Sequence, residues 1–174
     1  MEPRILPKSK NPRVPEAPYP FRHSMPLQTR FTDFDMLGHL NNNVYMAFMD
    51  MAKADYFTRV IGGSVDWRDP GVVVANTNVD YFAPVFPREP IEVVTTVTRL
   101  GQKSIHLDQR ILDAETGETM CMATTVMVGF DIATGHSRPI DPQWIEALEN
   151  YEQRPLTAKS QQLPTTKSLF NNKC

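Results

Sequence analysis

One segment of this chain, Val44 to Ile61, restricts the possible folds more than any other. It is rich in Met, Ala, Phe and Tyr, and it contains no Gly or Pro before Gly62 and Gly63, so it predicts a helix. Polar residues interrupt its apolar pattern at only a few positions, which are Asp50, Lys53, Asp55, Thr58 and Arg59. A helix that is apolar on nearly every side is buried, so other parts of the chain must cover it.

Five strand-like runs are available to cover this helix. They are rich in Val, Ile, Thr and aromatic residues, and they lie at 25–31, 72–82, 91–100, 104–113 and 119–130. The gaps between the last three runs are short and hold turn residues, which predicts antiparallel hairpins. Residues 141–151 begin with Asp-Pro and predict a short terminal helix. The expected class is therefore α+β, with a curled five-stranded antiparallel sheet wrapped around one long buried helix.

The composition divides the chain into three zones. Residues 1–24 form a Pro-rich extension, which predicts an extended arm, either loose or lying on the surface. Its basic residues are more simply solvated than bound to a phosphate. Residues 25–152 hold the single domain, and residues 153–174 are polar and lack periodicity, which predicts a disordered tail.

The overall charge and the cysteines exclude several classes of protein. The formal net charge of −2 favours neither nucleic acid nor an anionic membrane as a partner. The chain has no apolar run that could cross a bilayer or act as a signal peptide, so a cytoplasmic location is expected. Two cysteines, Cys121 and Cys174, give no disulfide framework, and the four histidines lack ligand spacing. We therefore expect no metal and no cofactor.

The polar segment before the helix carries most of the chemistry that the sequence offers. Within residues 30–45 it holds Asp33, Asp35, His39 and three consecutive Asn residues. The first amides of a helix are free and lie at its positive end, where they can stabilise a developing negative charge. A carboxylate held beside them can act as a base or a nucleophile.

This segment also carries a family resemblance. Residues 33–45, D-F-D-M-L-G-H-L-N-N-N-V-Y, resemble the signature of hotdog-fold thioesterases of the 4-hydroxybenzoyl-CoA thioesterase and acyl-ACP thioesterase type. The segments V-D-Y-F-A-P (79–84) and G-Q-K-S (101–104) and the small residue Ala123 agree with the same pattern in the same order. The resemblance covers about residues 26 to 132. It implies a hotdog fold and a homodimer or homotetramer whose active site lies between two subunits.

The resemblance also implies roles for individual residues. Asp35 matches the catalytic carboxylate, as nucleophile or general base, and the backbone amide of Asn42 matches the donor that polarises the thioester carbonyl. His39 matches a His of the acyl-ACP branch, and Tyr45 matches a Tyr that shapes the site. The turn formed by Gln102, Lys103 and Ser104 lies where related enzymes hold the phosphates of CoA.

The chain departs from both branches of the family. Leu37 stands where the acyl-ACP branch has an Asn, and the 4-hydroxybenzoyl-CoA enzyme lacks a counterpart of His39. The expected reaction is hydrolysis of an acyl-CoA to a free acid and a thiol, without a cofactor. Two alternatives stay open, an acyl-ACP thioesterase and a non-catalytic module that binds acyl thioesters. A hotdog hydratase agrees less well with the sequence, because the Asp and His pattern that such enzymes carry after the helix is not found at that place in this chain.

Each candidate residue also has a plain structural interpretation. Asp33 and Asp35 are both suited to hydrogen-bond nearby amides of a turn. The side chains of Asn41 and Asn42 suit helix caps, and Tyr45 suits the core. Lys103 is most simply a solvated hairpin charge. A helix carboxylate is catalytic in another hotdog branch, which makes Asp50 a reserve candidate.

Overall fold

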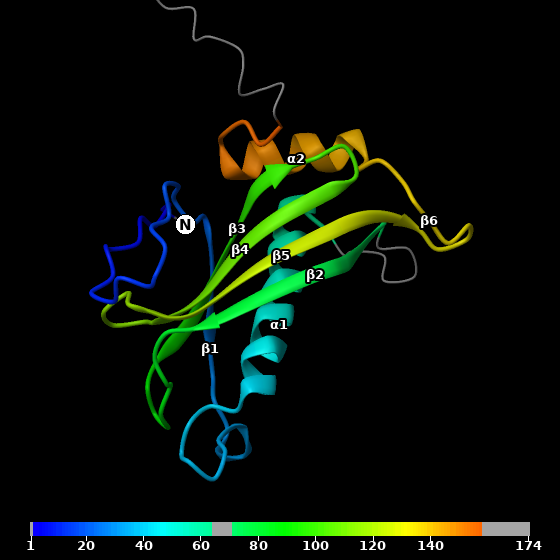
Figure 1. The fold of residues 1–174 in the computed structure, drawn as a ribbon. Coiled ribbons are helices and arrows are strands. Elements are labelled where there is room, and N and C mark those ends of the chain that lie inside the picture. Colours follow the sequence, from blue (N-terminus) through cyan, green and yellow to red (C-terminus); the bar gives the residue numbers. More distant parts are fainter. Residues whose placement is uncertain (1, 64–70, 158–174) are drawn as a thin grey trace, which may run out of the picture.

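The chain folds as one antiparallel sheet with a long helix on one face (Figure 1). The computed structural model describes residues 2–63 and 71–157. Its elements are β1 (His23–Leu27), the 3-10 turn η1 (Phe31–Asp33), α1 (Asn42–Ile61), β2 (Val72–Tyr81), β3 (Ile91–Leu100), β4 (Ser104–Asp113), β5 (Thr119–Asp131), β6 (His136–Ser137) and α2 (Pro142–Glu152). The strand order is β1-β3-β4-β5-β2, and β6 pairs with the end of β5. This α+β arrangement confirms the predicted hotdog fold.

Among the boundaries that differ from the sequence prediction, those of β1 and α1 have clear local physical reasons. β1 begins at His23 and ends at Leu27, because Phe31–Asp33 turns as a 3-10 helix instead of continuing the strand. α1 begins at Asn42, because the Asn41 side chain accepts from the backbone N–H of Asn43 and caps the helix. Most of the predicted tail, residues 158–174, lies outside the described residues.

α1 is buried on one side only within a single chain. It packs against β1, β3 and β4, and its buried face includes Tyr45, Phe48, Met49, Tyr56 and Phe57. A buried side chain of this size contributes about 1.5–3 kcal/mol, so this face anchors the helix. The opposite side carries Asp50 and Met51, and Met51 is 56% exposed. Within one chain the sheet covers only one side of α1. The nearly complete burial predicted for this helix is therefore observed for one face only.

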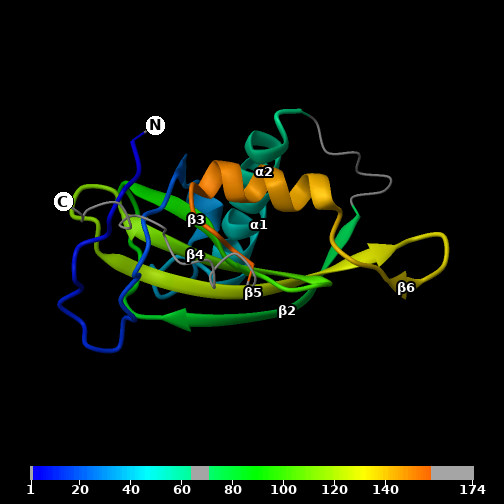
Figure 2. The same ribbon diagram turned by 90° about the horizontal axis from the view of Figure 1, so that it is seen from above.

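The core has two parts along the length of α1. The first half of the helix packs with Ile91, Ile111 and Cys121, and the second half packs with Leu100 and Ile105. α2 lies over the second half, as Figure 2 shows from above. The two ends of α1 therefore have different neighbours, with α2 at one end and the loop of residues 31–41 at the other.

The N-terminal arm lies on the outer face of the sheet, away from α1 (blue in Figure 1). Backbone hydrogen bonds run both ways between Arg4 and Phe21, at 2.7 and 2.8 Å, so residues 5–20 form a loop with closed ends. Phe21 is buried against Val94 and Leu112 of the sheet. The prolines of this arm therefore form an ordered loop on the surface of the sheet.

The part of the chain that the structure describes contains neither a membrane-spanning helix nor a metal-binding cluster. No helix within residues 2–63 and 71–157 is long and apolar enough to span a membrane. No cluster of three or more His, Cys, Asp or Glu side chains in these ranges is arranged to hold a metal ion.

Candidate active site

The first turn of α1 presents one backbone amide with no acceptor. The amide of Asn41 donates to the carbonyl of Asp33 at 2.8 Å, and the amide of Asn43 donates to Oδ1 of Asn41 at 3.0 Å. The amide of Asn42 lies between them and has no hydrogen-bond acceptor among the described residues. This N–H stands at the positive end of a 20-residue helix, where it can bind an oxyanion.

A cavity of about 290 Å³ opens beside this amide. Its walls come from the start of α1 and from the end of β2, and they comprise His39, Leu40, Asn42, Tyr45 and Tyr81 to Pro84. Three of the four predicted catalytic residues, His39, Asn42 and Tyr45, therefore share one cavity. No hydrogen bond joins these three side chains in the structure.

Tyr45 fixes the segment that follows β2. Its hydroxyl accepts from the backbone N–H of Val85 at 3.2 Å, and the carbonyl of Val85 accepts from the amide of Leu40 at 2.9 Å. Burial raises the pKa of Tyr45 to about 12, so its hydroxyl is neutral near pH 7. Tyr45 therefore acts as a wall and a hydrogen-bonding anchor.

Two further aromatic residues belong to this site, and sequence reasoning missed their role. The ring of Tyr81 packs edge-on against Tyr45, with centroids 5.2 Å apart, and Phe86 packs edge-on against His39 at 5.1 Å. Tyr81 appeared in the sequence only as part of the strand-ending motif. An aromatic residue at the end of a strand is common, so only the packing reveals its place in the cavity.

Asp35 does not line this cavity within a single chain. Its Oδ1 accepts from the backbone amides of Leu37 at 2.8 Å and of His39 at 3.2 Å. Gly38 completes the turn with a φ of 76°, a conformation that favours glycine. The Asp35 carboxylate therefore organises the turn that carries His39, while its Oδ2 has no partner among the described residues.

The predicted CoA turn lies at the other end of the sheet from Asn42. Residues 101–103 join β3 to β4 beside α2, whereas α1 begins at the opposite end (Figure 1). Nζ of Lys103 donates to the carbonyl and the hydroxyl of Ser137, at 3.2 and 3.1 Å. Ser104 contacts His106 at 3.2 Å. One chain therefore does not bring Gln102, Lys103 and Ser104 to the candidate cavity.

The carboxylates of α1 have local partners and lie outside the cavity. Asp50, whose side chain is exposed, forms an ion pair at 2.7 Å with the buried Lys53. Asp55 forms a hydrogen bond with His23 at 2.9 Å and an ion pair with Arg59 at 2.7 Å. These contacts favour a structural role for both carboxylates.

Known proteins share this fold and this chain's sequence pattern. The thioesterase-like superfamily matches residues 29–148. The long-chain acyl-CoA thioesterase FadM of Escherichia coli (strain K12) is 25% identical over 126 residues, which cover 71% of this chain and 94% of FadM. A thioesterase of Thermus thermophilus, crystallised with coenzyme A and Zn, is 30% identical with a TM-score of 0.70, and the match covers 78% of this chain and 98% of that one. A 1,4-dihydroxy-2-naphthoyl-CoA thioesterase of Synechocystis shares the fold with a TM-score of 0.64 at 19% identity, over 72% of this chain and 94% of that one.

The chain therefore belongs to the thioesterase-like superfamily, because the match spans well over half of its length. The enzyme class predicted from the sequence, a thioester hydrolase, is confirmed at the level of this family.

Proposed function

We propose that this protein is an acyl-CoA thioesterase that hydrolyses its substrate at the cavity beside Asn42. The observation that carries the proposal is the unpaired amide of Asn42 at the start of α1, in a residue that lines one cavity with His39 and Tyr45. A fold alone does not define a reaction, whereas a free donor at a helix terminus suits the oxyanion of acyl transfer. The acyl-CoA and coenzyme A named for two relatives support CoA as the carrier.

The proposed reaction takes its oxyanion contact from this geometry and the role of Asp35 from the family motif. The thioester carbonyl oxygen accepts from the Asn42 amide, and one such donor typically lowers the barrier by about 3 kcal/mol. Asp35 either removes a proton from the attacking water or attacks the carbonyl itself to form a mixed anhydride, which water then hydrolyses. The C–S bond breaks in the tetrahedral intermediate, and the thiolate takes up a proton, for which His39 in the same cavity is the candidate donor.

We also propose that two chains share each site. β2 is an edge strand whose outer side has no partner among the described strands, and Val74 on it is 49% exposed. Antiparallel pairing of two such edges places the end of one β2 beside the start of the other. The turn of residues 102–104 in one chain then lies on the same side of the dimer as Asn42 of the other chain. This arrangement lets Lys103 bind CoA phosphates, and a tetramer of such dimers is compatible with it.

Thiol release from a panel of short, long and aromatic acyl-CoA substrates tests the proposal. The comparison is between the wild type, Asp35→Asn and the matched variant Asp33→Asn, whose carboxylate accepts from the backbone amide of Arg30 at 2.7 Å. We expect Asp35→Asn to lower kcat/KM by about 100-fold or more, and Asp33→Asn to change it by less than about threefold.

Other results would redirect the proposal. Equal loss in both variants would assign the effect to the loop fold. Release from acyl carrier protein esters alone would identify the acyl-ACP alternative. Tight binding of acyl-CoA without any thiol release would favour a non-catalytic acyl-binding module.

A further inference from the structure

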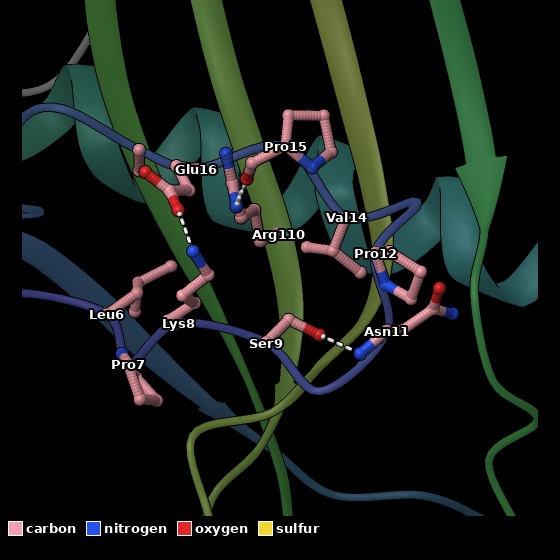
Figure 3. A pocket seen from close by; sticks show the side chains of 11 residues that line it. Leu6, Pro7, Lys8, Ser9, Asn11, Pro12, Val14, Pro15, Glu16 and Arg110 are labelled. Atoms are coloured by element: carbon pink, nitrogen blue, oxygen red, sulfur yellow. Dashed lines mark hydrogen bonds and ion pairs between the residues drawn. The ribbon is translucent and has the colours of Figure 1, made fainter.

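The outer face of the sheet carries a second cavity, of about 660 Å³, beneath the N-terminal arm. Figure 3 shows it inside the loop of residues 5–20, with Arg110 of β4 as the contribution of the sheet. Arg110 alternates along β4 with Gln109, whose side chain reaches the carbonyl of Met49 on α1 at 2.8 Å. The cavity and the candidate active site therefore lie on opposite faces of the sheet.

A buried charge pair holds the arm in place around this cavity. Arg110 is only 2% exposed and forms an ion pair with Asp108 at 3.0 Å. Oδ2 of Asp108 also accepts from the hydroxyl of Tyr19 at 2.7 Å, and Nη1 of Arg110 donates to the carbonyl of Pro15 at 2.8 Å. The guanidinium therefore sits at the wall of the cavity, and one of its contacts there is to an uncharged oxygen.

The charged residues of the cavity suit a ligand that accepts hydrogen bonds. Two cations, Lys8 and Arg110, line it together with one carboxylate, Glu16. Lys8 and Glu16 form an ion pair across the loop at 3.0 Å, but their side chains are 83% and 71% exposed. Such an exposed pair contributes at most about 1 kcal/mol, so an incoming anion can replace Glu16 at low cost. Arg110 is already paired with Asp108, so a ligand carboxylate replaces only the Pro15 carbonyl on Nη1, and a carboxylate is a stronger partner for that N–H than a carbonyl group is.

The remaining walls combine Leu6, Val14, Ala17 and three prolines with the polar residues Ser9 and Asn11. A cavity of this size with apolar walls and a few convergent polar groups is typical of a small-molecule site. We propose that the arm and the outer face of the sheet form a second binding site, for an aliphatic monocarboxylate. Its carboxylate binds Lys8 and Arg110, and its chain lies among Leu6, Val14 and Ala17. A free acid is also what the proposed hydrolysis releases; that link rests on the proposed function, whereas the binding does not.

A titration of the full-length protein with octanoate, followed by ¹H–¹⁵N NMR, tests the site directly. We expect amide shifts in residues 6–17 that saturate with a dissociation constant in the range of about 1 mM. Lys8→Gln weakens this binding by about fivefold, and Ala17→Trp, which fills the cavity, abolishes it. The matched variant Lys10→Gln removes a neighbouring exposed charge outside the cavity and leaves binding unchanged. The neutral analogue 1-octanol binds at least about tenfold more weakly, because it lacks the charge.

The shifts also separate this site from the candidate active site. Octanoate shifts confined to residues 39–45 and 81–84 would overturn the proposal while agreeing with the proposed function. No shift in residues 6–17 up to about 10 mM, or equal binding by Lys8→Gln and the wild type, would also overturn it. Saturable shifts in residues 6–17 support the site even if the protein releases no thiol from acyl-CoA.

Discussion

The two ends of α1 differ in whether the polar groups beside them have hydrogen-bond partners. At its start, the Asn42 amide has no partner among the described residues, and Asn42 lines a cavity. Near its other end, the carboxylate of Glu152 is 1% exposed and accepts from the Tyr56 hydroxyl at 2.6 Å, from Thr96 at 2.8 Å and from the Val97 amide at 3.1 Å. Paired buried groups fix a structure, whereas an unpaired donor beside a cavity is available to a ligand. The start of the helix is therefore the end suited to chemistry.

The largest expected effect comes from removing the amide donor itself. Asn42→Pro deletes the N–H at the first helical position, where proline fits, and Asn41 already has the extended ψ of 138° that a following proline requires. We expect kcat to fall by about 10²–10³-fold with the fold retained, as measured by thiol release and circular dichroism.

Asn42→Ala is the matched control, because it keeps the N–H and removes the side chain. It should remain within about threefold of the wild type. Equal losses of kcat in the two variants would indicate that the side chain of Asn42, and not its amide, is needed. Full activity of Asn42→Pro would show that this amide has no part in the mechanism.

A substitution at the other end of α1, beside Glu152, should lower stability and leave activity unchanged. Tyr56→Phe removes one donor to the buried Glu152 carboxylate, and we expect it to lower the free energy of unfolding by about 1.5–3 kcal/mol. Urea denaturation measures this loss, while kcat should stay near the wild-type value. A stable Tyr56→Phe variant with lost activity would contradict the division between the two ends.

Stability should also depend on pH through His23, which is buried next to Asp55 and Tyr56. Burial lowers the pKa of His23 below its usual 6.5, so the unfolded chain binds a proton more readily than the folded one. Stability is therefore lost as the pH falls from about 6.5 towards the folded pKa, with a slope of at most about 1.4 kcal/mol per pH unit.

Glu152 works in the opposite direction, because burial raises its pKa and protonation favours the folded state above pH 4.5. Urea denaturation of wild type and His23→Gln at pH 7.5 and at about pH 6 separates the two groups. A loss that is the same in both proteins would exclude His23 as its source.

The smallest expected effect lies on the exposed face between the two ends. Asp50→Asn removes the charge partner of Lys53; the Asp50 side chain is 65% exposed but that of Lys53 only 9%, so we expect a cost of about 1 kcal/mol. Thiol release should be unchanged. A large loss of kcat with normal stability would place the catalytic carboxylate on the helix instead of at Asp35.

The regular elements of the fold could be predicted because their patterns are local. The alternating runs gave β3 and β4 at their observed bounds, and the Gly-free stretch before Gly62 gave α1 with its correct end. The prediction of His39, Asn42 and Tyr45 as neighbours rested on a family motif, and the structure places them around one cavity.

Other features depend on contacts between segments that are distant in sequence. Nothing in the pattern around Tyr81 indicates that its ring meets Tyr45, because 36 positions separate them and only the sheet brings them together. The arm was expected as an extended segment, but its anchor, the Asp108–Arg110 pair, lies in what reads as an ordinary strand. The catalytic role of Asp35 stays a prediction, since its carboxylate binds turn amides within one chain.

The region matched by the family, residues 29–148, leaves out the arm whose Tyr19 and Pro15 contact the buried pair of Asp108 and Arg110. A chain trimmed to that region loses the cover over Val94, Leu112 and both charges. Water and salt would then screen the ion pair, and the exposed apolar residues would promote self-association. Protein engineering that begins at the family boundary should therefore keep the arm as the cover of this face of the sheet.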